Sequence, residues 1–402
     1  MNVDTIRSHF PALERLHAQK PVAYFDAPGG TQVPRQVAEA ITDYLFHHNA
    51  NTHWAYPTSE ETDAILLDAR RAAADLLNAR PEEIAFGANM TTLTFHLARA
   101  LGRSWGEGDE VIVTELDHHA NVAPWQALSM DRNIETRMAR LIPETMQLDY
   151  EHLASLVTER TKLIAVGGAS NAVGTINDLQ RVAKIARDAK ALLFVDAVHL
   201  APHELIDVQA IGCDFLACSS YKFYGPHAGI LFGRFELLDT LPFPKLAPAP
   251  DTAPERVETG TQNHEGIAGI TATIDFLASI GGEGGTRRER LQRAYAQLHA
   301  DGLRLTQMLW EALSSMKHVR LFGPPPSQPR TPTISFVVEG AGCDDVSRTL
   351  AREALFASSG DFYAATVCSR LELESLVRVG CACYTTEDEV RRLIAAVASL
   401  KE

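Results

Sequence analysis

The chain has 402 residues, of which 46% are hydrophobic, and its formal net charge is -14 with a pI near 5.5. This length and apolar content are sufficient for a large core, and they predict one large domain with a smaller domain attached. The acidic balance gives no electrostatic footprint for a nucleic-acid backbone or an anionic lipid surface. We therefore expect neither nucleic acid nor membrane as a partner.

The N-terminal stretch MNVDTIRSHFPALERL has no basic region followed by an apolar run. No window of the sequence approaches the roughly 18 apolar residues that a membrane-spanning helix needs. We therefore expect a cytoplasmic protein. The cysteines are Cys213, Cys218, Cys343, Cys368, Cys381 and Cys383. They are too dispersed for a disulfide framework or a zinc site, so we expect most of them to be buried and reduced, and we expect no bound metal.

Apolar residues at helical spacing predict a long helix that begins at a capping box, Thr58-Ser59-Glu60-Glu61, and runs to Asn78. Short runs of β-branched and apolar residues follow, with helical patterns such as 179–189 between some of them. The predicted strands are Glu83–Phe86, Val111–Thr114, Leu163–Val166, Leu192–Val195, Phe215–Cys218 and Ile230–Phe232. This alternation predicts an α/β fold with a mostly parallel sheet between helices.

A proline-rich stretch from Leu241 to Pro250 predicts a loop at an active site or between domains. Beyond about residue 265 the pattern changes to long helices at 267–280 and 287–315, a strand at 333–338, another helix, and a C-terminal amphipathic helix from Thr386. We interpret residues 23–264 as the large domain. Residues 1–22 and 265–402 are interpreted as a small α+β domain.

Two polar side chains follow predicted strands. Lys222 lies in Ser219-Ser-Tyr-Lys222, and Asp196 ends the run Leu192-Leu-Phe-Val-Asp196. Parallel strands end at one edge of a sheet, where ligands bind, so both residues are candidates for a site. The alternatives are a surface lysine and a strand-end cap. If Asp196 faces a pyridine nitrogen, the charge-assisted bond is worth on the order of 1.5–3 kcal/mol and keeps the ring protonated as an electron sink.

Asn89-Met90-Thr91-Thr92 lies between a predicted strand and the helical pattern 93–101. Such a helix start binds a phosphate through its free N–H groups and dipole, although an ordinary threonine cap is the alternative. The sequence has neither GxGxxG before a helix nor GxxxxGK[ST], which disfavours dinucleotide and P-loop sites. His118 and His119 are adjacent and point to different sides of a regular element, so one of them could stack on a ring or move protons, but a shared metal is disfavoured.

With these residues the chain resembles the class V aminotransferases, and among them the cysteine desulfurase-like proteins. Seven blocks in the family's order carry the resemblance, which covers nearly the whole chain: Tyr24-Phe-Asp-Ala-Pro-Gly-Gly-Thr31, Asp117-His-His-Ala-Asn-Val-Ala-Pro-Trp125, Ala169-Ser-Asn-Ala-Val-Gly-Thr175, Val195-Asp-Ala-Val-His199, Ser219-Ser-Tyr-Lys222, Glu258-Thr-Gly-Thr-Gln-Asn263 and Val377-Arg-Val-Gly380. The resemblance implies a pyridoxal 5'-phosphate (PLP) enzyme of fold type I.

The resemblance also implies a role for each matching residue. Lys222 would carry PLP as a Schiff base, His118 would stack on the pyridine ring, and Asp196 would pair with the ring nitrogen. The other implied cofactor contacts are His199 at the phenolic oxygen and, at the phosphate, Met90 through its backbone, Thr91, Ser219 and Tyr221. Thr261 would reach the phosphate in the neighbouring subunit, which implies a homodimer. Asn171 and Arg378 would hold the substrate carboxylate, Arg378 by its planar fork.

Two positions depart from the family's pattern. His199 stands where desulfurases have glutamine, as it does in some desulfurase-like relatives. The family's persulfide-forming loop, Arg-Thr-Gly-His-His-Cys, aligns with 358–363, so Tyr363 replaces the nucleophilic cysteine beside the substrate. Cys368 is five residues further on, and its apolar neighbours predict a packed residue in a helical segment.

We therefore expect Lys222 to take the α-proton of an amino acid, with carbon–sulfur β-elimination from L-cysteine or an S-conjugated cysteine as the outcome. One alternative is a true desulfurase that uses Cys368. Another is transamination, epimerisation or decarboxylation, which share the early steps. A non-catalytic scaffold is a further alternative, and intact Lys222, Asp196 and Arg378 argue against it.

Overall fold

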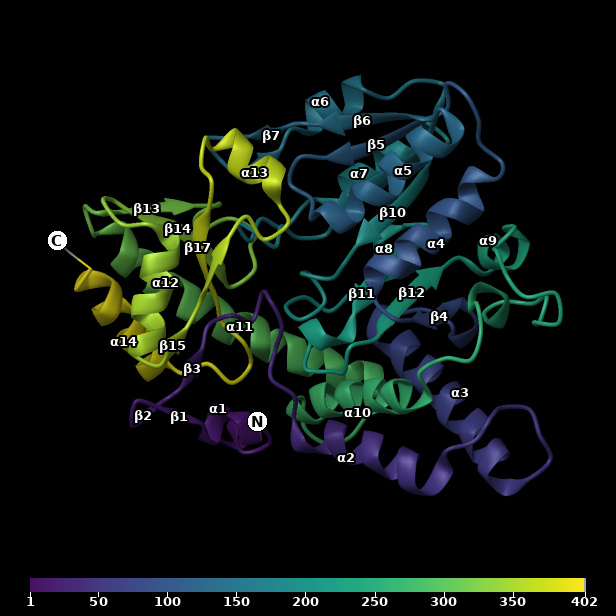
Figure 1. Cartoon of the computed structure of the whole chain (residues 1–402), viewed down its shortest axis with the longest axis horizontal. Coiled ribbons are helices and arrows are strands. Elements are labelled where there is room, and N and C mark those ends of the chain that lie inside the picture. The colour runs from purple at the N-terminus through teal and green to yellow at the C-terminus, as the bar shows by residue number, and fades with distance from the viewer. Residues whose placement is uncertain (401–402) are drawn as a thin grey trace.

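A seven-stranded sheet forms the larger half of the protein in a computed structural model, which describes residues 1–400 (Figure 1). The strand order is β4-β12-β11-β10-β9-β5-β6, and β12 alone runs in the direction opposite to the other strands. The strands are β4 (Ile84–Gly87), β5 (Glu110–Thr114), β6 (Glu135–Ala139), β9 (Thr161–Gly167), β10 (Leu192–Asp196), β11 (Phe215–Ser219) and β12 (Gly229–Gly233). The predicted mostly parallel sheet is confirmed.

Both faces of this sheet are buried, because alternate residues of each strand enter different apolar clusters. On β10, Leu193 and Val195 join one cluster and Phe194 joins the other. The first cluster is shared with α3 (Pro57–Leu77), α7 (Leu179–Asp188) and α10 (His264–Ile280), and the second with α4 (Met90–Gly102) and α5 (Ala123–Arg132). The site-bearing strands are therefore held from both sides.

Helix α3 ends at the predicted residue but begins earlier than the sequence predicted. Asn78 has a left-handed φ of 56° and closes the helix. The capping box at Thr58 is wrong, because Pro57 is the first helical residue and the preceding Tyr56 makes no side-chain cap. A proline suits this position, where its missing N–H has no helical partner.

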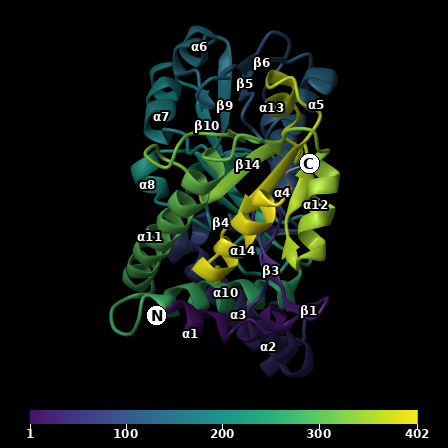
Figure 2. The ribbon, with the colours of Figure 1, turned by 90° about the vertical axis from the view of Figure 1, so that its left-hand side faces the viewer.

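The smaller half contains a four-stranded antiparallel sheet, in the order β13-β14-β17-β16. Seen from that end, α11 and α12 flank β14 on the left and right, and α14 lies below it (Figure 2). The bounds are β13 (Val319–Phe322), β14 (Thr333–Val338), β16 (Ser358–Gly360), β17 (Leu376–Gly380), α11 (Arg287–Ser314), α12 (Cys343–Arg352), α13 (Ala365–Arg370) and α14 (Glu387–Ala398).

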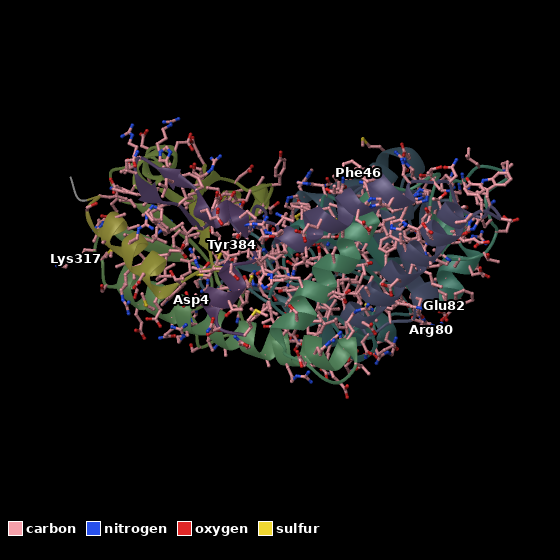
Figure 3. The ribbon with its side chains drawn as sticks, turned by 90° about the horizontal axis from the view of Figure 1, so that it is seen from below. Asp4, Phe46, Arg80, Glu82, Lys317 and Tyr384 are labelled. Atoms are coloured by element: carbon pink, nitrogen blue, oxygen red, sulfur yellow. The ribbon has the colours of Figure 1, made fainter. Side chains whose placement is uncertain are left out.

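Several segments connect the two halves. Helix α10, which the sequence analysis assigned to the smaller domain, packs against α3 and against α2 (Arg35–Asp43) of the larger half. Strand β3 (Ala23–Tyr24), from the start of the predicted large domain, pairs with β15 (Leu355–Phe356). Figure 3 shows Phe46 and Arg80 on the larger half and Lys317 at the far end of the smaller one. The predicted domain boundary at residues 264 and 265 stays a prediction.

Candidate active site

Four neighbouring strands deliver polar groups to one edge of the large sheet. Strand β10 ends at Asp196, and β11 ends at Ser219, directly before the short helix η5 (Ser220–Lys222) that carries Lys222. The parallel strands β5 and β9 end at the same edge, and Asp117-His118 follows β5. Between them lies a cavity of about 550 Å³. Ligands bind at this edge in open α/β sheets.

Nine of the twelve predicted site residues line this cavity: Met90, Thr91, His118, Asn171, Asp196, His199, Ser219, Tyr221 and Lys222. Three do not line it. Tyr363 and Arg378 lie just beyond it, against His118 and Asn171 respectively. Thr261 is exposed on the segment before α10. The structure therefore assembles the predicted set except for Thr261, and the role of each residue stays a prediction.

The amine of Lys222 is held at the cavity by backbone carbonyls. Its Nζ donates to Pro28 O at 2.6 Å and to Gly29 O at 2.9 Å. Burial is the main cause that lowers the pKa of Lys222 to about 8, and the positive charge of Arg378 adds to this effect. A lysine with this pKa is neutral in an appreciable fraction of molecules near neutral pH. The neutral amine can attack a carbonyl and accept a proton.

Asp196 is a buried carboxylate without a cationic partner. It is 7% exposed and accepts a hydrogen bond from Val198 N at 2.9 Å, and none of the ion pairs within residues 1–400 includes it. Burial raises its pKa to about 6, while the Val198 N–H and the charge of Lys222 oppose the rise. At neutral pH it is therefore mostly ionised. A protonated pyridine nitrogen is the kind of partner that this carboxylate lacks, so the residues present fit PLP.

Two histidines of the cavity are neutral. Burial is the first cause that lowers the pKa of His118 to about 4, and the charges of Lys222 and Arg378 lower it further. Burial also holds the pKa of His199 well below its usual range. The Nε2 of His199 lies 3.1 Å from the hydroxyl oxygens of Thr331 and Thr333. An uncharged imidazole can stack on a ring or hydrogen-bond to an oxygen without adding a positive charge.

The start of helix α4 forms another wall of the cavity. Asn89 caps the helix by accepting from Thr92 N at 2.9 Å. Met90, which we expected to face a phosphate through its backbone, donates that N–H to Ser219 Oγ at 2.9 Å. Thr91, the next residue of the helix, also lines the cavity. This helix start suits an anion through its dipole and its remaining N–H groups.

The segment aligned with the family's cysteine loop lies over the pair predicted to bind a carboxylate. Asn171 Nδ2 donates to Phe362 O at 2.9 Å, and Arg378 Nη1 donates to Asn171 O at 3.0 Å. Arg378 Nε and Asn171 Oδ1 are buried without a partner. The ring of Tyr363 lies 5.4 Å from that of His118, centroid to centroid, and is 72% exposed. Two buried polar atoms at one place are therefore free to receive a substrate group.

The six cysteines are all free, and none lines the cavity. Cys368 is 3% exposed on α13, as the sequence predicted. Burial raises the pKa of its thiol to about 11. Within residues 1–400 no group of three or more metal-ligating side chains comes together, and no helix there is long and apolar enough to cross a membrane.

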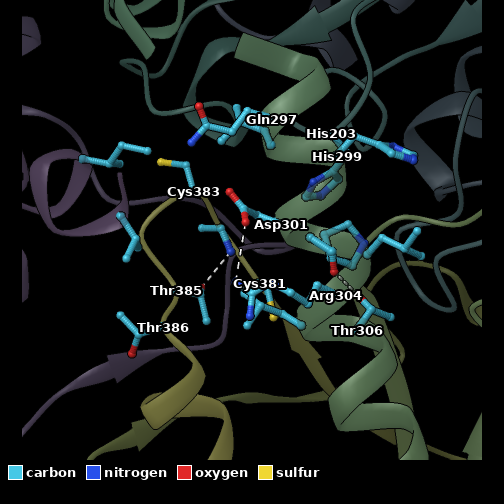
Figure 4. Close-up of a pocket in the computed structure, with 18 of the residues that line it drawn as sticks. His203, Gln297, His299, Asp301, Arg304, Thr306, Cys381, Cys383, Thr385 and Thr386 are labelled. Atoms are coloured by element: carbon cyan, nitrogen blue, oxygen red, sulfur yellow. Dashed lines mark hydrogen bonds and ion pairs between the residues drawn. The ribbon is translucent and has the colours of Figure 1, made fainter. Parts of the chain in front are cut away.

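A second cavity, of about 540 Å³, lies between α11 and the segment that joins β17 to α14 (Figure 4). His203 and His299 face it from one side and Thr385 and Thr386 from the other. Acidic and basic side chains share its rim, and Arg304 pairs with Glu387 there. None of the predicted site residues lines this cavity.

The parallel-dominated sheet, with a lysine and a carboxylate at its strand ends, matches the fold of PLP-dependent enzymes of fold type I. The family model for class-V aminotransferases matches residues 23–393, and the chain belongs to this family, whose members depend on PLP.

Several similar proteins and solved structures are named as cysteine desulfurases. The chain is 31% identical to a probable cysteine desulfurase of Xylella fastidiosa, with 99% of this chain and 95% of the relative covered. An apo cysteine desulfurase structure from Thermococcus onnurineus aligns with a TM-score of 0.89 at 26% identity, covering 100% of this chain and 98% of that one. A cysteine desulfurase structure from Escherichia coli aligns with a TM-score of 0.86 at 26% identity, covering 99% of this chain and 98% of that one.

One cavity-lining residue, and one buried carboxylate that is hydrogen-bonded to the cavity-lining Gly167, were not singled out from the sequence. His227 lines the cavity, yet it follows Gly225-Pro226 without any pattern that marks it. Asp117 is a buried carboxylate that accepts Gly167 N at 2.7 Å and Asn121 Nδ2 at 3.0 Å. Burial raises its pKa to about 7. Its position just after a predicted strand is a sequence signal similar to that of Asp196, which ends one.

Proposed function

We propose that this enzyme cleaves the carbon–sulfur bond of L-cysteine or an S-conjugated cysteine by β-elimination, without an enzyme thiol. The observation that carries the proposal is the absence of a cysteine around the cavity, among residues 1–400, in a chain whose relatives are named cysteine desulfurases. Tyr363 stands beside His118 where the family's loop has its cysteine. A phenol cannot accept a sulfur atom as a persulfide.

The residues present can perform this reaction. Bound PLP supplies the electron sink for the substrate carbon that loses its proton. Arg378 Nε is free to donate a hydrogen bond to the α-carboxylate, and Lys222, once displaced, would accept the α-proton on Nζ. Asp196, buried and mostly ionised near neutral pH, would pair with the ring nitrogen and keep it protonated. The Cβ–S bond then breaks with its electron pair on sulfur, which takes up a proton and leaves as a thiol or sulfide. The remaining 2-aminoacrylate is released, and one water molecule hydrolyses it to pyruvate and ammonia.

Product analysis tests this proposal. Purified enzyme loaded with PLP is given L-cysteine and an S-alkyl cysteine, and pyruvate, alanine, ammonia and sulfide or thiol are measured. We expect equal amounts of pyruvate and ammonia from both compounds. A desulfurase would form alanine from L-cysteine and leave the S-alkyl compound untouched. Keto acid of full carbon skeleton would instead indicate transamination. Either result would overturn the elimination proposal.

We further propose that the enzyme is a cytoplasmic homodimer in which Thr261 of one subunit reaches the phosphate in the other. Thr261 is exposed and lies outside its own cavity. Large apolar side chains are exposed near α2 and the start of α3, among them Phe46, labelled in Figure 3, and Trp54. Such a surface is typical of an interface. The six free cysteines fit a reducing compartment.

Mixed dimers test the contribution of Thr261. Lys222→Ala chains and Thr261→Ala chains are each expected to be inactive or weak alone. After unfolding and refolding together, each mixed dimer contains one site with both residues intact, so activity should return. No recovery in a sample shown by sedimentation to contain mixed dimers would place Thr261 outside the partner's site.

A further inference from the structure

The predicted phosphate contacts of the cofactor cavity are all uncharged. They are the backbone of Met90, whose N–H donates to Ser219 Oγ in the structure, the hydroxyl groups of Thr91, Ser219 and Tyr221, and Thr261 from the neighbour. A phosphate dianion in a partly buried cavity is stabilised most by charge-assisted hydrogen bonds. Lys222 is already engaged elsewhere in the cavity. His227 is the remaining basic side chain among the cavity-lining residues within 1–400, apart from the two neutral histidines.

The strand register places His227 at the start of helix α4. Strands β12 and β4 are antiparallel, and Gly229 lies opposite Gly87. His227, two positions before Gly229, therefore lies level with Asn89, which is two positions after Gly87 and directly precedes α4. The close approach is direct at Gly229, because a Cβ there would lie 2.6 Å from the backbone carbon of Asn89. His227 and the helix N-terminus consequently face the same end of the cavity.

The ring of His227 is held in place by Tyr221. The two rings are stacked, with centroids 4.9 Å apart and an interplanar angle of 13°. Tyr221 is itself a predicted phosphate contact and lines the same cavity. His227 is exposed, unlike the buried His199 of the same cavity. Its imidazole can therefore carry a charge at a smaller desolvation cost than a buried histidine.

We propose that His227 is a cofactor-binding residue that donates a ring N–H to the phosphate of PLP, between Tyr221 and the N-terminus of α4. This inference rests on the proposed position of the phosphate at α4. It adds a basic group to a set of otherwise neutral donors. A hydrogen bond of this kind to a charged acceptor changes affinity by about 10- to 100-fold.

Comparing PLP with pyridoxal, which lacks the phosphate, isolates this contact. Apoenzyme is titrated with each compound, and binding is followed by visible absorbance rather than by turnover. The variant His227→Phe keeps an aromatic ring on Tyr221 but has no N–H. We expect its PLP affinity to fall by about 10- to 100-fold while its pyridoxal affinity stays unchanged. The matched variant Thr91→Val should show the same selectivity for PLP, because it removes a predicted phosphate contact on the helix side.

The two variants separate the possible failures. Loss of PLP affinity in Thr91→Val, with none in His227→Phe, overturns the role of His227 and leaves the phosphate position intact. Normal PLP affinity in both variants overturns the position of the phosphate itself. Equal losses for PLP and pyridoxal in His227→Phe mean that the histidine only supports the wall of the cavity, which also refutes the proposal.

Discussion

The guanidinium carbon of Arg378 lies 3.9 Å from the centroid of the Phe362 ring, and the backbone carbonyl of Phe362 accepts the amide N–H of Asn171 at 2.9 Å. One residue of the segment that replaces the family's cysteine loop therefore contacts both groups predicted to bind the substrate carboxylate. The ring covers the face of the guanidinium, while Nε, on its edge, stays without a partner. Arg378 is thereby oriented for a ligand in its plane.

Replacing Phe362 with alanine should loosen this arrangement. A buried cation–π contact is worth about 0.5–2 kcal/mol, so we expect KM for an amino-acid substrate to rise about 3- to 30-fold with kcat little changed. Steady-state kinetics measures this, with an amine that lacks the carboxylate as the control substrate and Phe362→Tyr as the variant that keeps the ring. Equal changes in KM for the amino acid and the amine would show that Phe362 acts on the site as a whole.

The lowered pKa of Lys222 predicts how fast the apoenzyme captures its cofactor at different pH values. Only the neutral amine attacks an aldehyde, so the rate of covalent attachment should rise with pH and level off above about pH 8, well below the usual pKa of a lysine side chain. Stopped-flow absorbance with fixed PLP gives the profile, and Lys222→Ala should show no covalent attachment by borohydride reduction. A profile still rising at pH 10 would contradict the effect of burial on this lysine.

Asp196→Asn should separate cofactor binding from turnover. The phosphate contacts and Lys222 remain, so the variant should retain PLP, measured as cofactor released in base. The amide carries no negative charge to hold the ring nitrogen protonated, and loss of one such electrostatic partner costs about 10²- to 10³-fold in rate. Activity within a few-fold of the parent enzyme would make Asp196 a strand-end cap, the alternative that the sequence left open.

The sequence could predict the central strands because their apolar runs are buried on both faces. Two of these strands were predicted to end at Val195 and Cys218, one residue before their ends at Asp196 and Ser219 in the structure. Strand β6 was missed because it lies at the edge of the sheet and carries Glu135 and Arg137, which hide the strand pattern. Lys222, Asp196 and His118 lie around one cavity because the strands that precede them end at the same edge of the sheet. The sequence could indicate this, since each residue ends or follows a predicted strand.

Contacts between distant segments could not be predicted. Nothing local marks the pairing of Arg378 with Phe362, because it depends on how β17 and the segment after β16 pack against Asn171. His227 reaches the cavity only through the register of β12 on β4. Both contacts join segments that are distant in the sequence, and the spacing of residues along a single chain carries no signal for such contacts.

The proposal of elimination without a thiol depends most directly on Cys368, the cysteine nearest in sequence to the family's nucleophile position. Thiolates are the reactive form, and burial raises the pKa of this thiol to about 11, with the charge of Asp361 acting in the same direction. The nearby cation, Arg370, does not relieve this, because its Nε donates to both oxygens of Glu115 at 3.0 and 2.9 Å. Near neutral pH the thiolate fraction of Cys368 is therefore very small.

Cys368→Ser should accordingly keep pyruvate formation from L-cysteine within about two-fold, since the substitution touches neither the cavity nor the amine of Lys222. The matched control is Cys343→Ser, a change at another cysteine that does not line the cavity, which guards against a general effect of removing a thiol. Intact-mass analysis after incubation with L-cysteine should find no added sulfur on the parent chain. A persulfide on Cys368, alanine as the product and an inactive Cys368→Ser variant would together refute elimination and make this enzyme a desulfurase with a displaced nucleophile.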